Sequence, residues 1–188
     1  MIYDGIVHIL DIDAQEHFNL PIAEVFKKYI HLSTIDDNNV ETIDLSGRNV
    51  KITDGTGWTQ LLQISRETVR SMVYVIHGGN IKGLINASSD LIIPIYDNRR
   101  SKQGFHGEVL YPYITLPISE CDSYTYQIRV FNFDNDEWES FEPFRFYKLE
   151  EVNKPGYSID SKSGFFNCSN MHLCTSDTRN RDGKESWK

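Results

Sequence analysis

The chain is a succession of short apolar segments separated by turn residues, and this pattern most constrains what it can fold into. Alternation of apolar and polar residues in short runs is typical of half-buried strands. Asp54-Gly55, Gly78-Gly79-Asn80 and Asp134-Asn135-Asp136 are turn signals between neighbouring runs. We therefore predict an all-β fold. The expected strands are residues 5–12, 49–53, 58–64, 68–77, 80–86, 90–96, 108–116, 124–133, 138–149, 157–160 and 165–173.

One stretch has the spacing of a helix. Asn19 can cap it, Pro21 fits its first turn, and apolar residues recur there every three to four positions. A single short helix on the outside of a sheet is therefore predicted. Its apolar residues are Leu20, Ala23, Val25, Phe26, Tyr29 and Ile30.

Irregular segments connect these elements without dividing the chain. Residues 35–48 are polar and turn-like, and residues 97–107 are a predicted loop. Pro94 is expected to lie at a sheet edge or a strand end, because proline cannot donate to a ladder. We predict one domain over residues 1–177. The polar tail that follows, residues 178–188, is interpreted as a remnant of a downstream host sequence.

The charge balance narrows the class of partner. The 188 residues include 19 basic and 27 acidic side chains, a formal net charge of −8, whereas phosphate binding needs clustered Lys and Arg. No apolar run approaches the roughly 20 residues of a membrane span, and the first residues lack the basic start of a signal sequence. We expect a cytoplasmic monomer that binds neither nucleic acid nor membrane, with its three cysteines reduced.

Cys168, His172 and Cys174 are the nearest approach to a metal-ligand cluster. In one continuous strand they would share a face, but a structural zinc site needs four ligands, and Cys121 has no paired neighbour. The acidic residues between Asp134 and Glu142 lack the spacing of an EF-hand. We expect no metal and no other cofactor, with a zinc site at the three clustered residues as the minor alternative.

Residues 57–96 resemble a known family. Gly57-Trp58 opens a predicted strand, a polar stretch with Arg66 follows, and a further strand ends at Gly78-Gly79. Ser88-Ser89-Asp90-Leu91 then precedes an apolar tail. This order is similar to that of the Hint domain, the fold shared by inteins and hedgehog autoprocessing domains. The resemblance implies a horseshoe of β-ribbons with one short helix, whose two ends lie side by side.

Both ends of the chain extend the resemblance. Ile2-Tyr3-Asp4-Gly5 and residues 21–26 are similar to the opening of a family member, where a nucleophilic cysteine is followed by a glycine, a strand and a helix. Residues 157–160 and 164–171 resemble the closing strands of an intein. The resemblance spans residues 2 to about 177 and implies a splicing domain held in cis between segments of a host protein.

The catalytic positions that the resemblance implies are substituted. The N-terminal nucleophile corresponds to Ile2, and the family's Thr-x-x-His motif corresponds to Ser88 and Leu91. In this family the nucleophile attacks the preceding carbonyl, and the histidine transfers protons. Ser88 keeps a hydroxyl, whereas Ile2 and Leu91 mark a lost nucleophile and a lost histidine.

The C-terminal junction has three registers. His172-Leu173-Cys174 keeps the histidine and a thiol, with Leu173 at the position of the lost asparagine. Cys174-Thr175-Ser176 has the best strand spacing but neither histidine nor asparagine. Ser176-Asp177-Thr178 keeps a carboxylate that cyclises poorly. If chemistry remains, Cys174 is the expected thiol and His172 its nearest base.

Three functional hypotheses follow. The first is an intein-like splicing or autoprocessing domain, impaired or inactive, without a homing endonuclease because residues 97–107 are too short to hold one. The alternative is a non-enzymatic Hint-like module that binds a protein through the aromatic strands near Trp138. The third is an unrelated β-barrel or sandwich with a ligand pocket among its tyrosines. The third is favoured if the chain ends lie far apart.

Overall fold

Strands dominate the computed structural model, which describes residues 1–54, 57–78, 85–96, 102–103, 109–110, 113–120, 127–132, 137–169 and 171–175. In these ranges the only α-helix is α1 (Ile22–Tyr29), and 3-10 turns lie at Ile30–Leu32 and Ile118–Glu120. The predicted all-β class with one short helix is confirmed. The strands are β1 (Ile6–Asp11), β2 (Glu16–Pro21), β3 (Ser33–Ile35), β4 (Glu41–Asp44), β5 (Val50–Thr53), β6 (Trp58–Gly78), β7 (Ile85–Ser88), β8 (Ile92–Tyr96), β9 (Lys102–Gln103), β10 (Val109–Leu110), β11 (Tyr113–Pro117), β12 (Gln127–Asn132), β13 (Glu137–Ser161), β14 (Phe165–Cys168) and β15 (Met171–Cys174).

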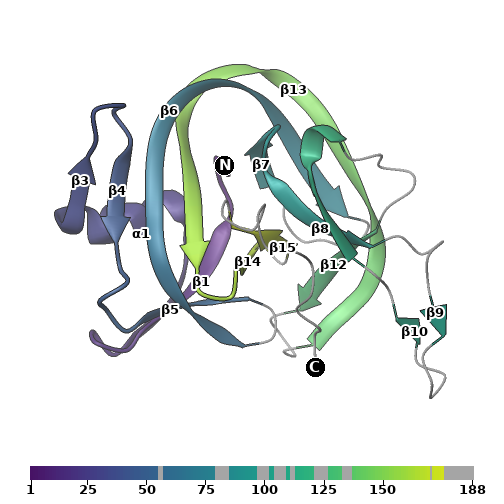
Figure 1. The fold of residues 1–188 in the computed structure, drawn as a ribbon, viewed down its shortest axis with the longest axis horizontal. Coiled ribbons are helices and arrows are strands. Elements are labelled where there is room, and N and C mark those ends of the chain that lie inside the picture. The colour runs from purple at the N-terminus through teal and green to yellow at the C-terminus, as the bar shows by residue number, and fades with distance from the viewer. Residues whose placement is uncertain are drawn as a thin grey trace.

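Two long strands frame the molecule. β6 has 21 residues and β13 has 25, and they pair antiparallel along one curved ribbon that arches around β1, β7, β14 and β15 (Figure 1). The prediction of four separate strands at 58–64, 68–77, 138–149 and 157–160 is wrong. No turn forms near Arg66 or Gly156, because Arg66 pairs with Tyr157 and Glu67 pairs with Gly156. Each strand thus satisfies the backbone of the other through the expected breaks.

The helix lies beside the sheet that continues from β6 through β5 and β1 to β2. Its predicted cap is wrong, because Asn19 is part of β2 and pairs with His8 of β1. Pro21 precedes the helix without any side-chain cap, and the N–H of Ile22 donates to the carbonyl of Gly5 at 3.0 Å. That hydrogen bond satisfies one of the helix's unpaired donors, so the sequence needs no Ser, Thr, Asp or Asn there.

Residues 35–48 are not the irregular segment that was predicted. They include most of a hairpin of β3 and β4, and β4 also pairs with β6 through Glu41 and Arg66. Their polar composition hid the strands because Ile43 is the only fully buried residue of β3 and β4. The side chains of Glu41 and Arg66 form an ion pair across β4 and β6.

The predicted loop at 97–107 contains β9, and its other residues lie outside the described ones, as do residues 79–84 and the turn at 134–136. β8 lies between β11 and β12, so Pro94 is not on an edge strand. Pro94 pairs with Thr115 of β11 on one side. On the other side, the described residues of β12 pair with β8 at Tyr96 and not at Pro94. Since the described part of β12 does not pair with β8 at Pro94, the N–H that proline lacks leaves no gap in that ladder.

The C-terminal strands form a hairpin instead of the single strand predicted over 165–173. β14 and β15 pair with Phe165 opposite Cys174 and with Cys168 opposite Met171, and Ser169 turns the chain at a positive φ of 45°. Cys168 therefore does not share one strand with His172 and Cys174. It packs in the main core, whereas Cys174 packs with Ile92 and Phe165. The geometry assumed for the zinc alternative is wrong.

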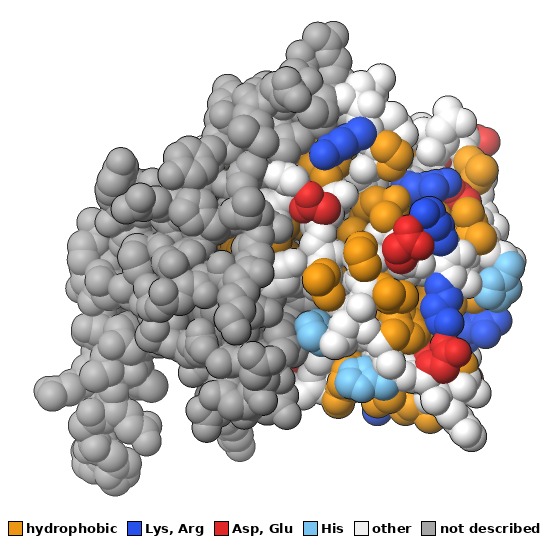
Figure 2. All heavy atoms as spheres, turned by 180° about the vertical axis from the view of Figure 1, so that it is seen from behind, with side chains coloured by type: hydrophobic (Ala, Val, Ile, Leu, Met, Phe, Trp, Pro, Cys, Tyr) orange, Lys and Arg blue, Asp and Glu red, His pale blue; other side chains and the backbone are white. Residues whose placement is uncertain are grey.

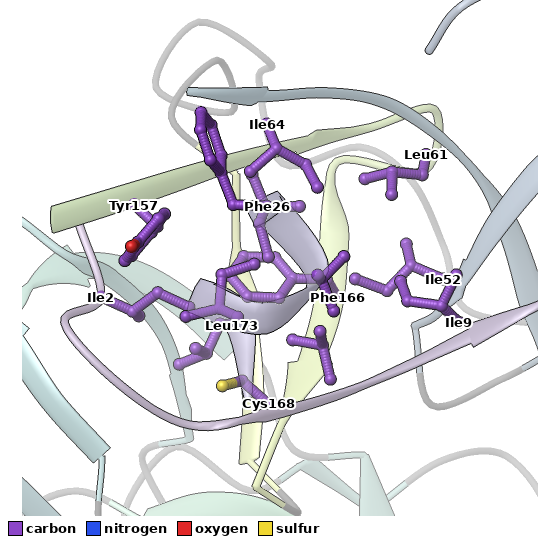
Figure 3. Packing of buried hydrophobic residues seen from close by; sticks show 14 of the residues in the cluster. Ile2, Ile9, Phe26, Ile52, Leu61, Ile64, Tyr157, Phe166, Cys168 and Leu173 are labelled. Atoms are coloured by element: carbon purple, nitrogen blue, oxygen red, sulfur yellow. The ribbon is translucent and has the colours of Figure 1, made fainter. Parts of the chain in front are cut away.

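The main core joins the two ends of the chain to the helix. Phe26 of α1 is fully buried, and its ring lies 5.6 Å from the ring of Tyr157 on β13. Figure 3 shows Ile2 and Leu173 close to this aromatic pair. Because Ile2 and Leu173 are each 0% exposed, the first and last described strands are both anchored by apolar burial.

The described surface is mixed in charge. On the face in Figure 2, acidic and basic side chains lie side by side among hydrophobic ones, and Lys27 with Glu24 and Lys28 with Glu16 form ion pairs at 2.6 Å. Among the described residues, no helix has the length and hydropathy of a membrane span.

Candidate functional site

Residues 1–3 form a short strand between β7 and β13. Ile2 is bridged to Ala87 on one side and to Tyr157 on the other. The N–H of Ile2 donates to the carbonyl of Tyr157 at 2.8 Å, and the N–H of Tyr157 donates back at 2.7 Å. On the β7 side, the N–H of Ser88 donates to the carbonyl of Met1 at 3.0 Å. The backbone at the start of the chain is thus held from both sides.

Two glycines make room for this strand. Gly5 has φ of +127°, and a Cβ there would overlap Cys168 Sγ. A Cβ on Gly156 would lie 3.1 Å from Met1 Sδ and 3.2 Å from Tyr3. The glycine that matched the family opening is therefore required by backbone conformation and by contact. Burial raises the pKa of the Cys168 thiol, so this cysteine stays protonated and is not a nucleophile.

The first residues of the chain and the last residue of β15 line one pocket. It has a volume of about 60 Å³, and its walls come from the first strand, from the turn after β7, from β13 and from the C-terminal hairpin. The expectation that the backbone near Ile2 lies beside that near Cys174 is met, and this arrangement speaks against the unrelated barrel with distant ends. The lining residues are Met1, Ile2, Asp90, Leu91, Ile92, Tyr157, Ser158, Ile159, Phe166 and Cys174.

Ser88 lies directly against the backbone of the first residue. Its Oγ is 2.7 Å from Met1 N and 3.2 Å from Met1 O. The hydroxyl also makes a short hydrogen bond to the carboxylate of Asp90. A hydroxyl has one proton to donate, and a carboxylate is a stronger acceptor than a carbonyl. Ser88 therefore donates to Asp90 and accepts from Met1 N, while its own N–H holds Met1 O.

Asp90 is the site residue that sequence reasoning missed. Its half-exposed carboxylate lies 3.5 Å from Met1 N. Burial raises the pKa of Asp90, but the amino group of Met1 and the hydrogen bond from Ser88 outweigh burial and hold the pKa below its ordinary value. The motif treats this position as a spacer, and the only signal in the sequence was an acid between a hydroxyl residue and an apolar strand.

Leu91 and Ile2 are the residues that the resemblance aligns with the family's histidine and nucleophile. Leu91 follows Ser88 in a tight turn, closed by a hydrogen bond of 3.1 Å from its N–H to the Ser88 carbonyl. Its side chain lines the pocket, so an imidazole at this position would face the same space. Ile2 differs, because its side chain is fully buried in the main core.

The C-terminal residues divide between two faces of β15. Cys174 lines the pocket, whereas Leu173 points into the main core and is 0% exposed. His172 stacks on Phe165 with ring centroids 4.9 Å apart, and its Nδ1 lies 3.2 Å from Asn167 Oδ1. His172 therefore contacts two residues of β14 and is not among the residues that line the pocket.

Several predicted residues lie outside the described part of the chain. They are Ser176, Asp177 and Thr178 of the alternative junction, Cys121, and the side chain of Trp138 in β13. The preceding residue, Thr175, is buried, and its N–H donates to the carbonyl of Gly164 at 3.0 Å. The polypeptide that leaves the hairpin is therefore fixed up to Thr175.

No protein-family model and no curated protein matches the sequence. Solved intein structures are similar in fold. An intein from a hyperthermophile has a TM-score of 0.65 at 9% identity and covers 92% of this chain and 96% of its own. The transcription factor IIB Mvu mini-intein has a TM-score of 0.66 at 11% identity, with 93% and 98% covered. The TvoVMA intein has a TM-score of 0.58 at 12% identity, with 92% and 96% covered. This likeness, along nearly the whole chain, identifies the fold as the all-β Hint fold of inteins.

Proposed function

We propose that residues 1–177 are a protein-splicing or autoprocessing domain, held in cis between host segments, whose chemistry is impaired. The observation that carries the proposal is the single pocket that contains both Met1 and Cys174. A reaction that joins or separates flanking segments needs both junctions within one site, because reacting atoms must be held in contact distance. The fold supplies that proximity.

The impairment is proposed from the side chains at the two junctions. Met1 and Ile2 present a thioether and an alkyl group where an attacking thiol or hydroxyl is needed. Leu91 presents an alkyl group where an imidazole would transfer a proton. At the C-terminal side, Cys174 and Thr175 stand in place of histidine and asparagine in the register that the pocket favours. Each half of the reaction thus lacks at least one group.

That register is favoured because Cys174 lines the pocket and Leu173 does not. An asparagine at Leu173 would carry a primary amide into the main core, where burying an unpaired polar group costs about 1–3 kcal/mol. Thr175 is also buried, but it lies outside the main apolar core and already carries a polar side chain, so an asparagine there replaces one polar group with another. We therefore assign the C-terminal junction to Cys174, Thr175 and Ser176.

A fusion of the chain between two reporter domains tests the proposal. The unmodified fusion is expected to stay intact for days, with and without added thiol, as seen by gel and mass spectrometry. Ligated reporters would contradict the impairment. The variant C174H/T175N is expected to release the downstream reporter, because the asparagine amide nitrogen attacks its own backbone carbonyl and leaves a succinimide.

Two controls accompany the repaired variant. T175N alone, which lacks the added histidine, is expected to cleave more slowly, and L173N is expected to lose stability without cleavage. Circular dichroism shows whether each variant is folded. A folded C174H/T175N variant that leaves the fusion intact would contradict the splicing-type function and favour the non-enzymatic interaction module.

A further inference from the structure

We infer that Asp90, acting through the Ser88 hydroxyl, is the proton-transfer group of the N-terminal junction, and that the junction nitrogen is Met1 N instead of Ile2 N. This inference rests on the proposed function and deepens it. It assigns a role to a residue outside the matched motif positions and moves the junction one residue upstream of the one that the resemblance implied.

The contacts of the two nitrogens favour Met1. Met1 N is 2.7 Å from Ser88 Oγ and 3.5 Å from Asp90 Oδ1. Ile2 N instead donates to the carbonyl of Tyr157 at 2.8 Å, within a strand that is paired on both sides. A leaving nitrogen must accept a proton from a nearby group, and the group facing Ile2 N is a carbonyl, which has none to give.

The side chains of the two residues lead to the same assignment. Ile2 is fully buried among core residues such as Phe26 and Leu173, so a thiol in its place would face the core. Met1 and Ile2 both contribute to the lining of the pocket with Asp90 and Cys174, but Met1, unlike Ile2, is not part of the main core. A nucleophile at position 1 would therefore share the space in which the C-terminal strand ends.

Asp90, Ser88 and Met1 N form a continuous hydrogen-bonded path. Ser88 is 1% exposed and donates its single proton to Asp90 while it accepts from Met1 N. In the described lining of the pocket, Asp90 is the only carboxylate, and neither histidine nor lysine is present. When a host segment precedes Met1, this nitrogen becomes an amide that retains one N–H for Ser88. The positive charge that lowers the pKa of Asp90 is then absent, so the Asp90 carboxylate becomes a better proton acceptor.

A cysteine at position 1 would transfer the preceding acyl group from its nitrogen to its sulfur. The sulfur attacks the carbonyl carbon of the preceding host residue, a C–S bond forms, and the C–N bond to position 1 breaks. Asp90 accepts the thiol proton and returns it to Ser88 Oγ as the Ser88 hydroxyl gives its own proton to the leaving nitrogen, which becomes an amine. Added dithiothreitol then exchanges with the thioester and releases the upstream segment.

Matched cysteine variants test the register. In a fusion with an upstream reporter, M1C treated with dithiothreitol is expected to release the reporter at least tenfold faster than I2C, and mass spectrometry should place the cut before position 1. Faster release from I2C, with the cut before position 2, would overturn the assignment of the junction nitrogen.

Variants in the M1C background test Asp90. D90N and S88A are each expected to slow release at least tenfold, whereas S89A, which changes the neighbouring hydroxyl, should leave the rate unchanged. The acid limb of the pH–rate profile of M1C should disappear in D90N, an effect that a purely structural role would not produce. Adding L91H to M1C/D90N should restore release, because it supplies the missing imidazole.

The outcomes separate the two proposals. Full-rate release from M1C/D90N would overturn the role of Asp90. An inert M1C with an active M1C/L91H would also overturn it, while the splicing-type function would stand. An inert M1C/L91H that is folded by circular dichroism would contradict the N-terminal chemistry of the proposed function itself.

Discussion

Replacing Gly5 with alanine should test how the N-terminal strand is seated. The residue has φ of +127°, a conformation that L-residues rarely adopt, and holding alanine there costs about 1–3 kcal/mol. The new methyl group would overlap Cys168 Sγ, which adds about 1–3 kcal/mol of overpacking. Alanine also lowers the entropy of the unfolded chain, a gain of about 0.4–1 kcal/mol. The expected net loss is about 1–6 kcal/mol.

Urea denaturation measures this loss and separates its two causes. C168A removes the atom that the methyl group would meet, so G5A is expected to cost about 1–3 kcal/mol less in the C168A background than alone. C168A itself should cost about 1 kcal/mol for the deleted sulfur. An unchanged cost of G5A in the two backgrounds would refute the overlap, and a stabilisation by G5A in the C168A background would refute the backbone strain as well.

Two further changes probe the packing of the helix. Tyr29 donates to Asp11 at 2.7 Å, and burial, followed by that hydrogen bond, raises the pKa of its phenol. The folded state therefore keeps the phenol proton longer than the unfolded state does, so thermal stability should fall as pH rises above about 10, and Y29F should remove that slope. F26A should cost about 3–5 kcal/mol in chemical denaturation because Phe26 is 0% exposed, and F26L should cost less. A cost of F26A below that of F26L would contradict the packing.

The elements that the sequence predicted well are those with one buried face. Buried and more exposed residues alternate strictly along β1, where every second residue, Val7, Ile9 and Asp11, is buried. The predicted strand at 5–12 contains β1. β5 buries Val50 and Ile52 and was predicted to within one residue. In both strands the period of two is visible because neighbouring residues have different environments.

The elements that were missed are those whose surroundings hide the period. All residues of β14 and β15 are buried, so no period of two separates the two strands, and Ser169-Asn170 is the only turn signal between them. β3 and β4 are mostly polar and depend on pairing with each other and with β6. Glycine and proline at 155–156 suggest a turn, yet pairing with Glu67 and Thr68 keeps β13 extended. Tertiary pairing overrode local preference in each case.

The candidate site was predictable only in part. The resemblance placed Ser88, Leu91 and Cys174 at one site, and the structure brings them to the backbone of residues 1 and 2. The resemblance did not assign a role to Asp90, because the motif does not specify the residue at this position. Only the structure shows that its carboxylate contacts Ser88 and Met1 N. The resemblance also could not tell which face of β15 Leu173 occupies, since that depends on the hairpin that the sequence concealed.

The seating of residues 1–3 between β7 and β13 has a consequence for the order of events during synthesis. Ile2 is bridged to Ala87 on one side and to Tyr157 on the other, and Tyr157 is synthesised long after the first residues leave the ribosome. Until then the opening residues have no ladder on that side and the pocket has no wall from β13. The pocket is thus among the last parts of the molecule to assemble, since it is complete only after most of the chain has been synthesised.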